Sequence, residues 1–297
     1  MPTVGVEQAG GRWRYAFAAA VLLAGKPAAA AAQERVIEEH TASEPEGRLL
    51  AFYAAAVAYS PAGFLSNDAL TLGLELSYIP WLDASRRRPF ADKPEATNLA
   101  PLFPRPRIAA RLPGDFTAEA SWIPPLRVFD VRANLFAIAL TRPVASVGPV
   151  TLAPRLWATA GRVTGSMTCN EDTMLGQGVE LETYYLSVCH GRESEDWFEP
   201  RLLAGEILAT RALWTALDAY FVAGVRYDRT RFDIGVLRPD GSRDPDHPIL
   251  ELSAVLPHFA VGAVWESTGR VAAGLEGFYA PGSLFTIRAT GRWTWRY

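Results

Sequence analysis

Histidine is the residue type in this sequence best suited to acid–base catalysis near neutral pH. His258 lies five residues after Ser253, and on an extended strand that separation corresponds to about 16 Å, beyond hydrogen-bond reach. The other histidines are scattered along the chain: His40, His190 and His247. None of them stands with a serine or an acid in a spacing that suggests a catalytic triad. The sequence therefore predicts no catalytic residues and no enzyme activity.

Cys169 and Cys189 are the only two cysteines of the chain. With the adjacent His190 they supply too few ligands for a zinc site, so we expect no metal and no cofactor. In an exported protein such a pair favours a disulfide. Closing a loop of about 20 residues would stabilise the fold by roughly 3 kcal/mol in the chain-entropy model. We therefore predict a disulfide between Cys169 and Cys189.

Two acidic stretches raise the question of cation binding. The stretch 168–196 around the cysteines carries seven acids and one arginine, so it could bind divalent cations or a basic partner. The stretch 240–248 has aspartates in a spacing that resembles calcium ligands. However, Gly, Pro and Asp are also what a tight solvated loop requires, and a run of charge is usually a solvated face. We interpret both as solvated loops.

The N-terminus has the order of a secretory signal peptide. Arg12 and Arg14 precede the apolar run 15–25, and the small residues 28–32 follow, which is the pattern of a cleaved export signal. A buried core helix is the alternative, but it needs neither the preceding arginines nor the alanine tract. We predict that residues 1–32 are the signal peptide. Elsewhere no apolar run reaches the roughly 20 residues of a spanning helix.

The last segment of the chain alternates strictly between apolar and polar side chains. Burying its polar positions in a soluble core would cost several kcal/mol for each unpaired arginine, so the apolar face must point outward. This face carries Phe285, Ile287, Ala289, Gly291, Trp293, Trp295 and Tyr297, and the opposite face carries Thr286, Arg288, Thr290, Arg292, Thr294 and Arg296.

The same alternation recurs upstream in 71–78, 116–122, 219–228 and 270–276. We count about ten strands (8–12), which predicts an all-β fold, an antiparallel up-and-down transmembrane β-barrel. Short turns and longer loops then fall on opposite ends, as in bacterial barrels. The three long loops, 82–106, 166–197 and 234–249, fall on one end together with 123–130 and the short connection 280–283. The turns on the other end are 113–115, 142–149, 211–216 and 265–269.

The final residues, Arg292-Trp293-Thr294-Trp295-Arg296-Tyr297, resemble the C-terminal assembly signal of bacterial outer-membrane β-barrels. The resemblance covers about a dozen residues, with Trp293, Trp295 and Tyr297 as its aromatic positions. It implies a location in the cell outer membrane, contact with outer-membrane lipid, and recognition by periplasmic chaperones and the barrel-assembly machinery. The formal net charge of −3 and the absence of a basic cluster argue against a nucleic-acid partner.

Residues 33–66 lie between the signal peptide and the barrel, which we place at 67–297. The Ala-rich segment 48–60 lacks Gly and Pro and precedes Pro61, which predicts a helix. We expect this periplasmic or plug segment to lie in the lumen or at the periplasmic mouth, an arrangement loosely similar to the N-terminal hatch of outer-membrane transporters for hydrophobic molecules. The alternative is an eleventh strand, which would need a twelfth.

Charged residues of both signs fall on the predicted inner face. In a barrel of this size side chains just fill the interior, so we favour a salt-bridged, mostly closed core over a narrow conduit whose arginines favour anions. The predicted lumen residues are Glu75, Arg107, Arg111, Glu119, Arg132, Arg155, Glu206, Arg226, Asp228, Glu251, Arg270, Glu276, Arg288 and Arg292.

Three functions fit these predictions. The first is transport of a small solute across the outer membrane, a hydrophobic one if the hatch resemblance holds. The second is a closed structural or adhesion barrel that acts through its extracellular loops. The third is a soluble periplasmic carrier similar to a lipocalin.

Overall fold

The computed structural model describes residues 36–63, 70–80, 101–128, 131–170, 186–244, 247–267 and 270–295. The predicted signal peptide, Tyr297 and most of the acidic stretch between the two cysteines lie outside the described residues. In the described part of the chain no helix is long and apolar enough to cross a membrane.

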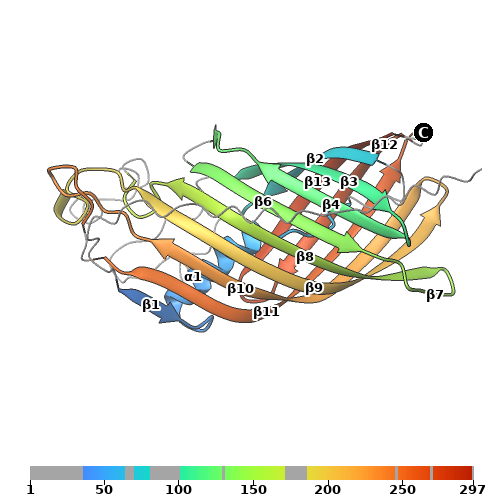
Figure 1. Cartoon of the computed structure of the whole chain (residues 1–297), viewed down its shortest axis with the longest axis horizontal. Helices are drawn as coiled ribbons and strands as arrows, with labels where there is room; N and C mark the ends of the chain where they lie inside the picture. The colour runs from blue at the N-terminus through green and yellow to red at the C-terminus, as the bar shows by residue number, and fades with distance from the viewer. Residues whose placement is uncertain are drawn as a thin grey trace, which may run out of the picture. The chain divides into compact units, whose positions relative to one another are not determined.

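Ten antiparallel strands form a closed barrel (Figure 1). Consecutive wall strands are neighbours throughout, β13 pairs with β2 (Ile287 opposite Tyr78), and β6 pairs with β8. The predicted up-and-down barrel is therefore confirmed. The wall strands are β2 (Leu70–Tyr78), β3 (Leu102–Leu112), β4 (Phe116–Ile123), β6 (Val131–Thr141), β8 (Val150–Gly165), β9 (Asp196–Trp214), β10 (Leu217–Asp233), β11 (Ile249–Glu266), β12 (Val271–Ala280) and β13 (Leu284–Trp295).

The apolar side chains of these strands face outward, as the alternation predicts. Leu74, Phe136, Leu156, Val261 and Phe285 are each 47–61% exposed. Charged and hydroxyl side chains alternate with them and are buried inside. A soluble core would have the reverse arrangement, so the wall has the polarity of a barrel in contact with lipid.

The two ends of the barrel differ. At the end where β8 and β10 finish and β9 and β11 begin, the connections are long, and we call this the long-loop end; we call the other the short-turn end. Strands β8 to β11 contain 16–19 residues, whereas β2, β4 and β12 contain 8–10. Two short strands, β5 (Arg127–Val128) and β7 (Ala145–Val147), extend β6 and β8 at opposite ends.

Strand β1 (Ile37–His40) pairs in parallel with residues 249–252 of β11, at the long-loop end. The pairing of β11 with β12 begins only at Phe259 opposite Tyr279, so this part of β11 would otherwise be an open edge. An unpaired edge invites aggregation, and β1 covers it. The segment before the barrel therefore begins at the long-loop end (Figure 1).

Helix α1 (Pro45–Ala56) runs from β1 into the lumen and contacts β10, β11 and β13. It begins three residues before the predicted start because Pro45 occupies the first turn, where its missing N–H costs nothing. It ends four residues before Ser60, the predicted end, because the carbonyls beyond Ala56 bond to the barrel wall instead of continuing the helix.

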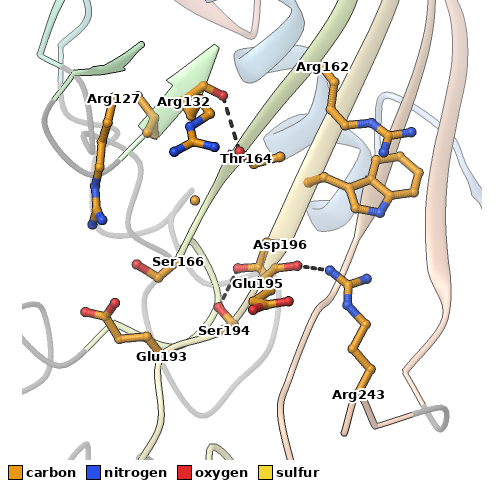
Figure 2. A pocket seen from close by; sticks show the side chains of 13 residues that line it. Arg127, Arg132, Arg162, Thr164, Ser166, Glu193, Ser194, Glu195, Asp196 and Arg243 are labelled. Carbon is orange, nitrogen blue, oxygen red and sulfur yellow. Dashed lines mark hydrogen bonds between the residues drawn. The ribbon is translucent and has the colours of Figure 1, made fainter. Parts of the chain in front are cut away.

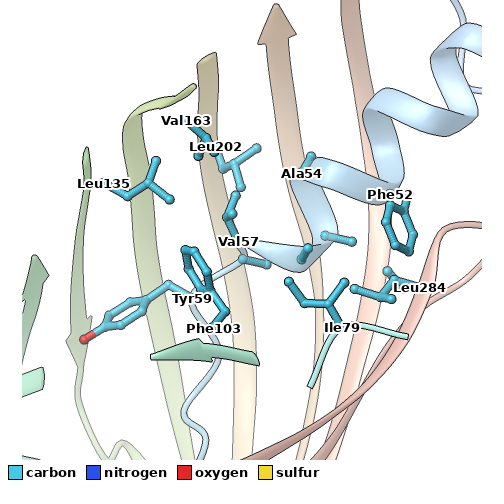
Figure 3. Close-up of a cluster of buried hydrophobic side chains, with 14 of the residues drawn as sticks. Phe52, Ala54, Val57, Tyr59, Ile79, Phe103, Leu135, Val163, Leu202 and Leu284 are labelled. Atoms are coloured by element: carbon cyan, nitrogen blue, oxygen red, sulfur yellow. The ribbon is translucent and has the colours of Figure 1, made fainter. Parts of the chain in front are cut away.

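A hydrophobic cluster surrounds the helix in the part of the lumen nearer to the long-loop end. Phe52 and Val57 are at most 5% exposed and lie among wall side chains such as Ile79, Leu202 and Leu284 (Figure 3). Tyr53 stacks near Phe232 at 6.2 Å between ring centroids. These contacts, rather than the helix's own amphipathicity, hold α1 inside the barrel.

Candidate functional site

The lumen contains a chain of alternating charges that runs along the inner wall. Arg107 donates to Glu75 (2.8 Å) and to Glu119 (2.6 Å), and Arg155 donates to Glu119 (3.3 Å) and to Glu206 (2.7 Å). These five side chains come from β2, β3, β4, β8 and β9 and are at most 6% exposed. Each buried charge thus has a partner of opposite sign, which buried charges require.

His258 extends this chain to β11. Its Nε2 lies 2.7 Å from Oε2 of Glu206, which also accepts a hydrogen bond from Nε1 of Trp157 at 2.8 Å. The imidazole packs between Trp157 and Phe278, with ring centroids 5.8 and 5.9 Å away. His258 was not among the predicted lumen residues, although it has the same parity as the inward-facing Ala260 and Val264.

The non-helical segment 57–63 crosses the lumen next to these charges. Arg105 donates to the backbone oxygens of Val57 (2.9 Å) and Ala58 (3.0 Å), and Arg288 donates to that of Ala58 (3.0 Å). Arg155 donates to the backbone oxygen of Tyr59 (2.9 Å). Carbonyls after a helix end need donors when they are buried, and here the arginines of the wall supply them.

Glu276 on β12 binds residues 60–62, the later part of the segment. It accepts hydrogen bonds from the Ser60 hydroxyl, from the backbone N–H of Ala62 (2.8 Å) and from the Tyr220 hydroxyl (2.9 Å). Thr290 donates to the backbone oxygen of Ala62 at 2.6 Å. The segment is therefore bound to opposite sides of the wall and crosses the lumen.

Gly63 and Gly274 allow the segment to approach the wall. Gly63 has φ +73°, and a Cβ at either glycine would lie 2.9 Å from the α-carbon of the other. Glycine is thus required by both conformation and space at Gly63.

The Tyr59 ring lies among three guanidinium groups. Its centroid is 4.2 Å from Cζ of Arg107, 5.3 Å from that of Arg155 and 5.4 Å from that of Arg105. Such cation–π contacts gain strength when water is excluded. Tyr59 and Arg105 were both missed from sequence, although Arg105 has the inward parity of Arg107.

The structure places ten of the fourteen predicted lumen residues in the buried interior. They are Glu75, Arg107, Glu119, Arg155, Glu206, Arg226, Asp228, Glu276, Arg288 and Arg292.

Arg132 and Glu251 face outward, so their predicted position was wrong. On β6 the inner face carries Val131 and Ala133, and Arg132 lies on the outer face. Glu251 has outward parity on β11, where it is only 4% exposed because it bonds to Arg229 (3.0 Å) and Arg231 of β10 on the outer side of the wall. The alternation misled at both places because these strands carry apolar residues on both faces near the long-loop end.

Arg111 and Arg270 have inward parity but lie exposed at the short-turn rim, which corrects their predicted place in the lumen. Arg111 bonds to Asp115 in the turn (2.7 Å) and its side chain is 51% exposed. The backbone oxygen of Arg270 accepts a hydrogen bond from Thr294 (2.8 Å). Both arginines lie at the short-turn ends of their strands, where water reaches the charge, and this costs less than burial.

The predicted disulfide between Cys169 and Cys189 is present at the long-loop end, and both residues are buried. Asp196 organises the loops beside it by accepting hydrogen bonds from the Gly235 N–H (2.7 Å) and the Ser194 hydroxyl (2.6 Å).

Asp240 accepts hydrogen bonds from the N–H (2.8 Å) and hydroxyl (2.7 Å) of Ser242, which lower its pKa. This geometry is that of a tight turn. In the described residues no group of three or more His, Cys, Asp or Glu could hold a metal ion.

No protein-family model and no curated protein matches this chain. Similar solved structures include the NanC porin, with 7% identity over 76% of this chain and 100% of that one, at a TM-score of 0.33. Others are the translocator domain of autotransporter NalP from Neisseria meningitidis (11% identity, 84% and 95% coverage, TM-score 0.32) and the P. putida toluene transporter TodX (10%, 83% and 72%, 0.29). These neighbours include bacterial outer-membrane β-barrels. At such values the likeness carries no inference about function, and the fold rests on this chain's own strand pairing.

Proposed function

We propose that this protein is an integral outer-membrane β-barrel that transports a small solute and is closed at rest by residues 45–63. The observation that carries the membrane assignment is the exposed apolar outer face around the closed barrel. Such a surface would aggregate in water and is stable against lipid. It argues against the soluble carrier.

The orientation follows from the two ends. Bacterial barrels keep short turns in the periplasm and longer loops outside, which places Trp295 and the short-turn end in the periplasm. Trp214, Trp265 and Trp295 lie exposed at this end, where indole rings favour the membrane interface. The loops joined by the disulfide then lie outside the cell.

Transport is supported by the way in which the lumen is closed. Segment 57–63 is held by hydrogen bonds from charged side chains, and water can replace such bonds when the segment moves. The inner wall that would be uncovered carries arginines and glutamates. It suits a small polar solute, anionic ones included, better than the hydrophobic solute that the hatch resemblance implies.

A reversible crosslink tests whether segment 57–63 is the gate. A Cβ at Gly63 would lie 3.0 Å from Oγ1 of Thr290, so cysteines at these two positions are close enough to join. We expect the reduced Gly63→Cys/Thr290→Cys variant to admit small sugars into liposomes, because the added side chain at Gly63 meets Gly274 and displaces the segment. Oxidation should lower the flux at least about tenfold, to background, because the crosslink holds the segment against the wall. Gly63→Cys alone and Thr290→Cys alone, each with and without oxidant, are the controls.

If the reduced double variant and the wild type both show only the flux of protein-free liposomes, the transport function is wrong. The closed adhesion barrel then becomes the better candidate. It is favoured by one observation, namely that Asp196 and the disulfide give the external loops a defined structure. Deletion of residues 168–196 should in that case abolish surface attachment while the barrel still assembles.

A further inference from the structure

Five arginines form a band on the outer wall near the long-loop end: Arg132 on β6, Arg162 on β8, Arg201 on β9, and Arg229 and Arg231 on β10. Strand alternation directs all five away from the lumen. The side chains of Arg162, Arg201 and Arg229 are 46–56% exposed. The band therefore lies at the outer edge of the lipid-facing surface.

The acids within this band do not balance its charge. Glu199 bonds to Arg162 (3.2 Å) and Arg201 (2.7 Å), and Glu251 bonds to Arg229 and Arg231. Five arginines and two glutamates leave a net charge of +3. Arg201 also lies directly opposite Arg229 in the strand pairing, and Glu199 and Glu251 offset the repulsion between these like charges.

A cavity of about 500 Å³ lies at one end of the band (Figure 2). Four arginines and three acids line it: Arg127, Arg132, Arg162 and Arg243, with Glu193, Glu195 and Asp196 on the side of the loops. Arg162 also packs over the Trp197 ring at 4.5 Å. An anion in this cavity would lie against the wall, next to the arginines.

A second hollow of about 590 Å³ lies on the outer face of β3, β4, β6 and β8, nearer to the short-turn end than the first cavity. Four outward-facing alanines form its floor, and isoleucine and leucine side chains form its rim. Because alanines replace larger side chains here, the lipid-facing surface is indented. The outward residues that line it are Ile108, Ala110, Ala118, Ala120, Ile138, Leu140, Leu156, Ala158 and Leu203.

The outer face of β6 connects the two features in order of decreasing polarity. Below Arg132 come Asn134, which accepts a hydrogen bond from Nε1 of Trp122 (3.1 Å), and Phe136, whose ring stacks with Trp122 at 5.8 Å. Ile138 follows and reaches the hollow. Along β6 the surface thus changes from charged to amphipathic to apolar, which is the order of headgroup, interface and acyl chain in a membrane lipid.

The distances agree with this match. Arg132 and Ile138 are six residues apart, which is about 20 Å along a strand. With the usual strand tilt this is about 15 Å along the membrane normal, or half of a hydrocarbon core of about 30 Å. A single lipid of the outer leaflet can therefore reach both places.

We propose that the outer face of β4, β6 and β8 binds an acyl lipid with a phosphate headgroup, its phosphate on Arg132 and Arg162 and one acyl chain in the alanine-lined hollow. Arginine suits this role because its guanidinium donates paired hydrogen bonds to phosphate oxygens. The site rests on the membrane location proposed above, but not on transport through the lumen.

Three probes separate the two parts of the site. Native mass spectrometry of the full-length protein in a non-ionic detergent would measure binding of phosphatidic acid, of diacylglycerol with the same acyl chains, and of glycerol 3-phosphate. We expect phosphatidic acid to bind at least about tenfold more tightly than either of the others, because only it engages both the arginines and the hollow.

Two variants assign the binding. Arg132→Gln/Arg162→Gln should reduce the affinity for phosphatidic acid to that for diacylglycerol. Ala120→Leu/Ala158→Leu, which fills the hollow with side chains that suit a lipid-facing strand, should reduce it about tenfold. The matched control is Arg111→Gln/Arg211→Gln at the short-turn end, which should leave it unchanged.

Equal binding of phosphatidic acid and diacylglycerol, or equal binding by the wild type and the arginine variant, would overturn the proposal. Binding of glycerol 3-phosphate as tight as that of phosphatidic acid would show a site for free phosphate and overturn it too. The crosslinked gate variant keeps this face intact, so failure of transport leaves lipid binding in place. Extraction of the protein into buffer without detergent would instead contradict the membrane location on which the lipid site rests.

Discussion

Arg155 on the barrel wall donates to the backbone oxygen of Tyr59 at 2.9 Å and lies 5.3 Å from the centroid of the same ring. The two residues are 96 positions apart in the sequence. This contact joins the charge network of the wall to segment 57–63, so the network also holds the segment that we propose as the gate.

Replacement of Arg155 should be strongly destabilising. Arg155→Gln leaves Glu119 and Glu206 with one buried partner fewer and the Tyr59 carbonyl without its donor. Loss of one member of a buried ion pair costs about 3–5 kcal/mol, and equilibrium urea unfolding in phosphatidylcholine vesicles measures it. Arg111→Gln, at an exposed pair, should cost less than about 1 kcal/mol. Equal losses in the two variants would contradict the buried network.

Two substitutions at Tyr59 should separate its ring from its hydroxyl. In the described residues the Tyr59 hydroxyl has no hydrogen-bond partner, so Tyr59→Phe should leave closure and stability nearly unchanged. Tyr59→Ala removes the ring from three guanidiniums and should raise liposome flux at least about tenfold, since each such contact contributes about 0.5–2 kcal/mol. Unchanged flux in Tyr59→Ala would show that the ring does not hold the segment.

An arginine at an outward position tests whether the wall faces lipid. Leu156 is 61% exposed at mid-height on β8, and Leu156→Arg should cost about 2–4 kcal/mol in a bilayer. Val147 is 66% exposed at the short-turn end, where Val147→Arg should cost at most about 1 kcal/mol. Unfolding in vesicles compares them. Two costs within about 0.5 kcal/mol of zero would indicate a surface in water.

Acidification should loosen the start of the N-terminal segment. The backbone N–H of Thr41 donates to Glu44 (3.1 Å) and His40 lies 3.0 Å away, and these contacts lower the pKa of Glu44 from 4.5. A carboxylate with a lowered folded-state pKa stabilises the fold above its ordinary pKa and ceases to do so as the pH falls through the folded value.

Amide hydrogen exchange of Thr41, after correction for intrinsic rates, should therefore accelerate as the pH falls below about 4.5. Glu44→Gln should remove this dependence. An identical pH profile in the variant would assign the change to another group.

Reduction should affect the loops rather than the barrel. The disulfide between Cys169 and Cys189 closes a loop with a sequence separation of 20, which is worth about 3 kcal/mol in the chain-entropy model. The Cys169→Ser/Cys189→Ser variant should still assemble, since the bond links no wall strands. Limited proteolysis with mass mapping should show cleavage near these residues in the variant first. Failure of the barrel to assemble would contradict this separation.

The wall of the barrel was predictable because the alternation of side chains within a single membrane strand indicates which face points outward. In β13, Thr and Arg alternate with aromatic and aliphatic residues over the whole strand, and only an outward apolar face avoids burying unpaired arginines. The same rule misplaced Arg132 and Glu251. Both lie beyond the lipid-facing levels, where either face of a strand can carry charge, so the pattern there no longer reports the orientation.

The strands, their alternation, the disulfide and a helix before the barrel could all be predicted from the amino acids alone, because each depends on residues close together in the chain or on the only two thiols. The path of residues 57–63 across the lumen became visible only in the folded chain. Arg105, Arg155 and Arg288 bond to the carbonyls of this segment from three strands, at sequence separations of 47 to 230. A carbonyl has the same chemistry in every residue, so no local pattern could indicate which ones the arginines would bind.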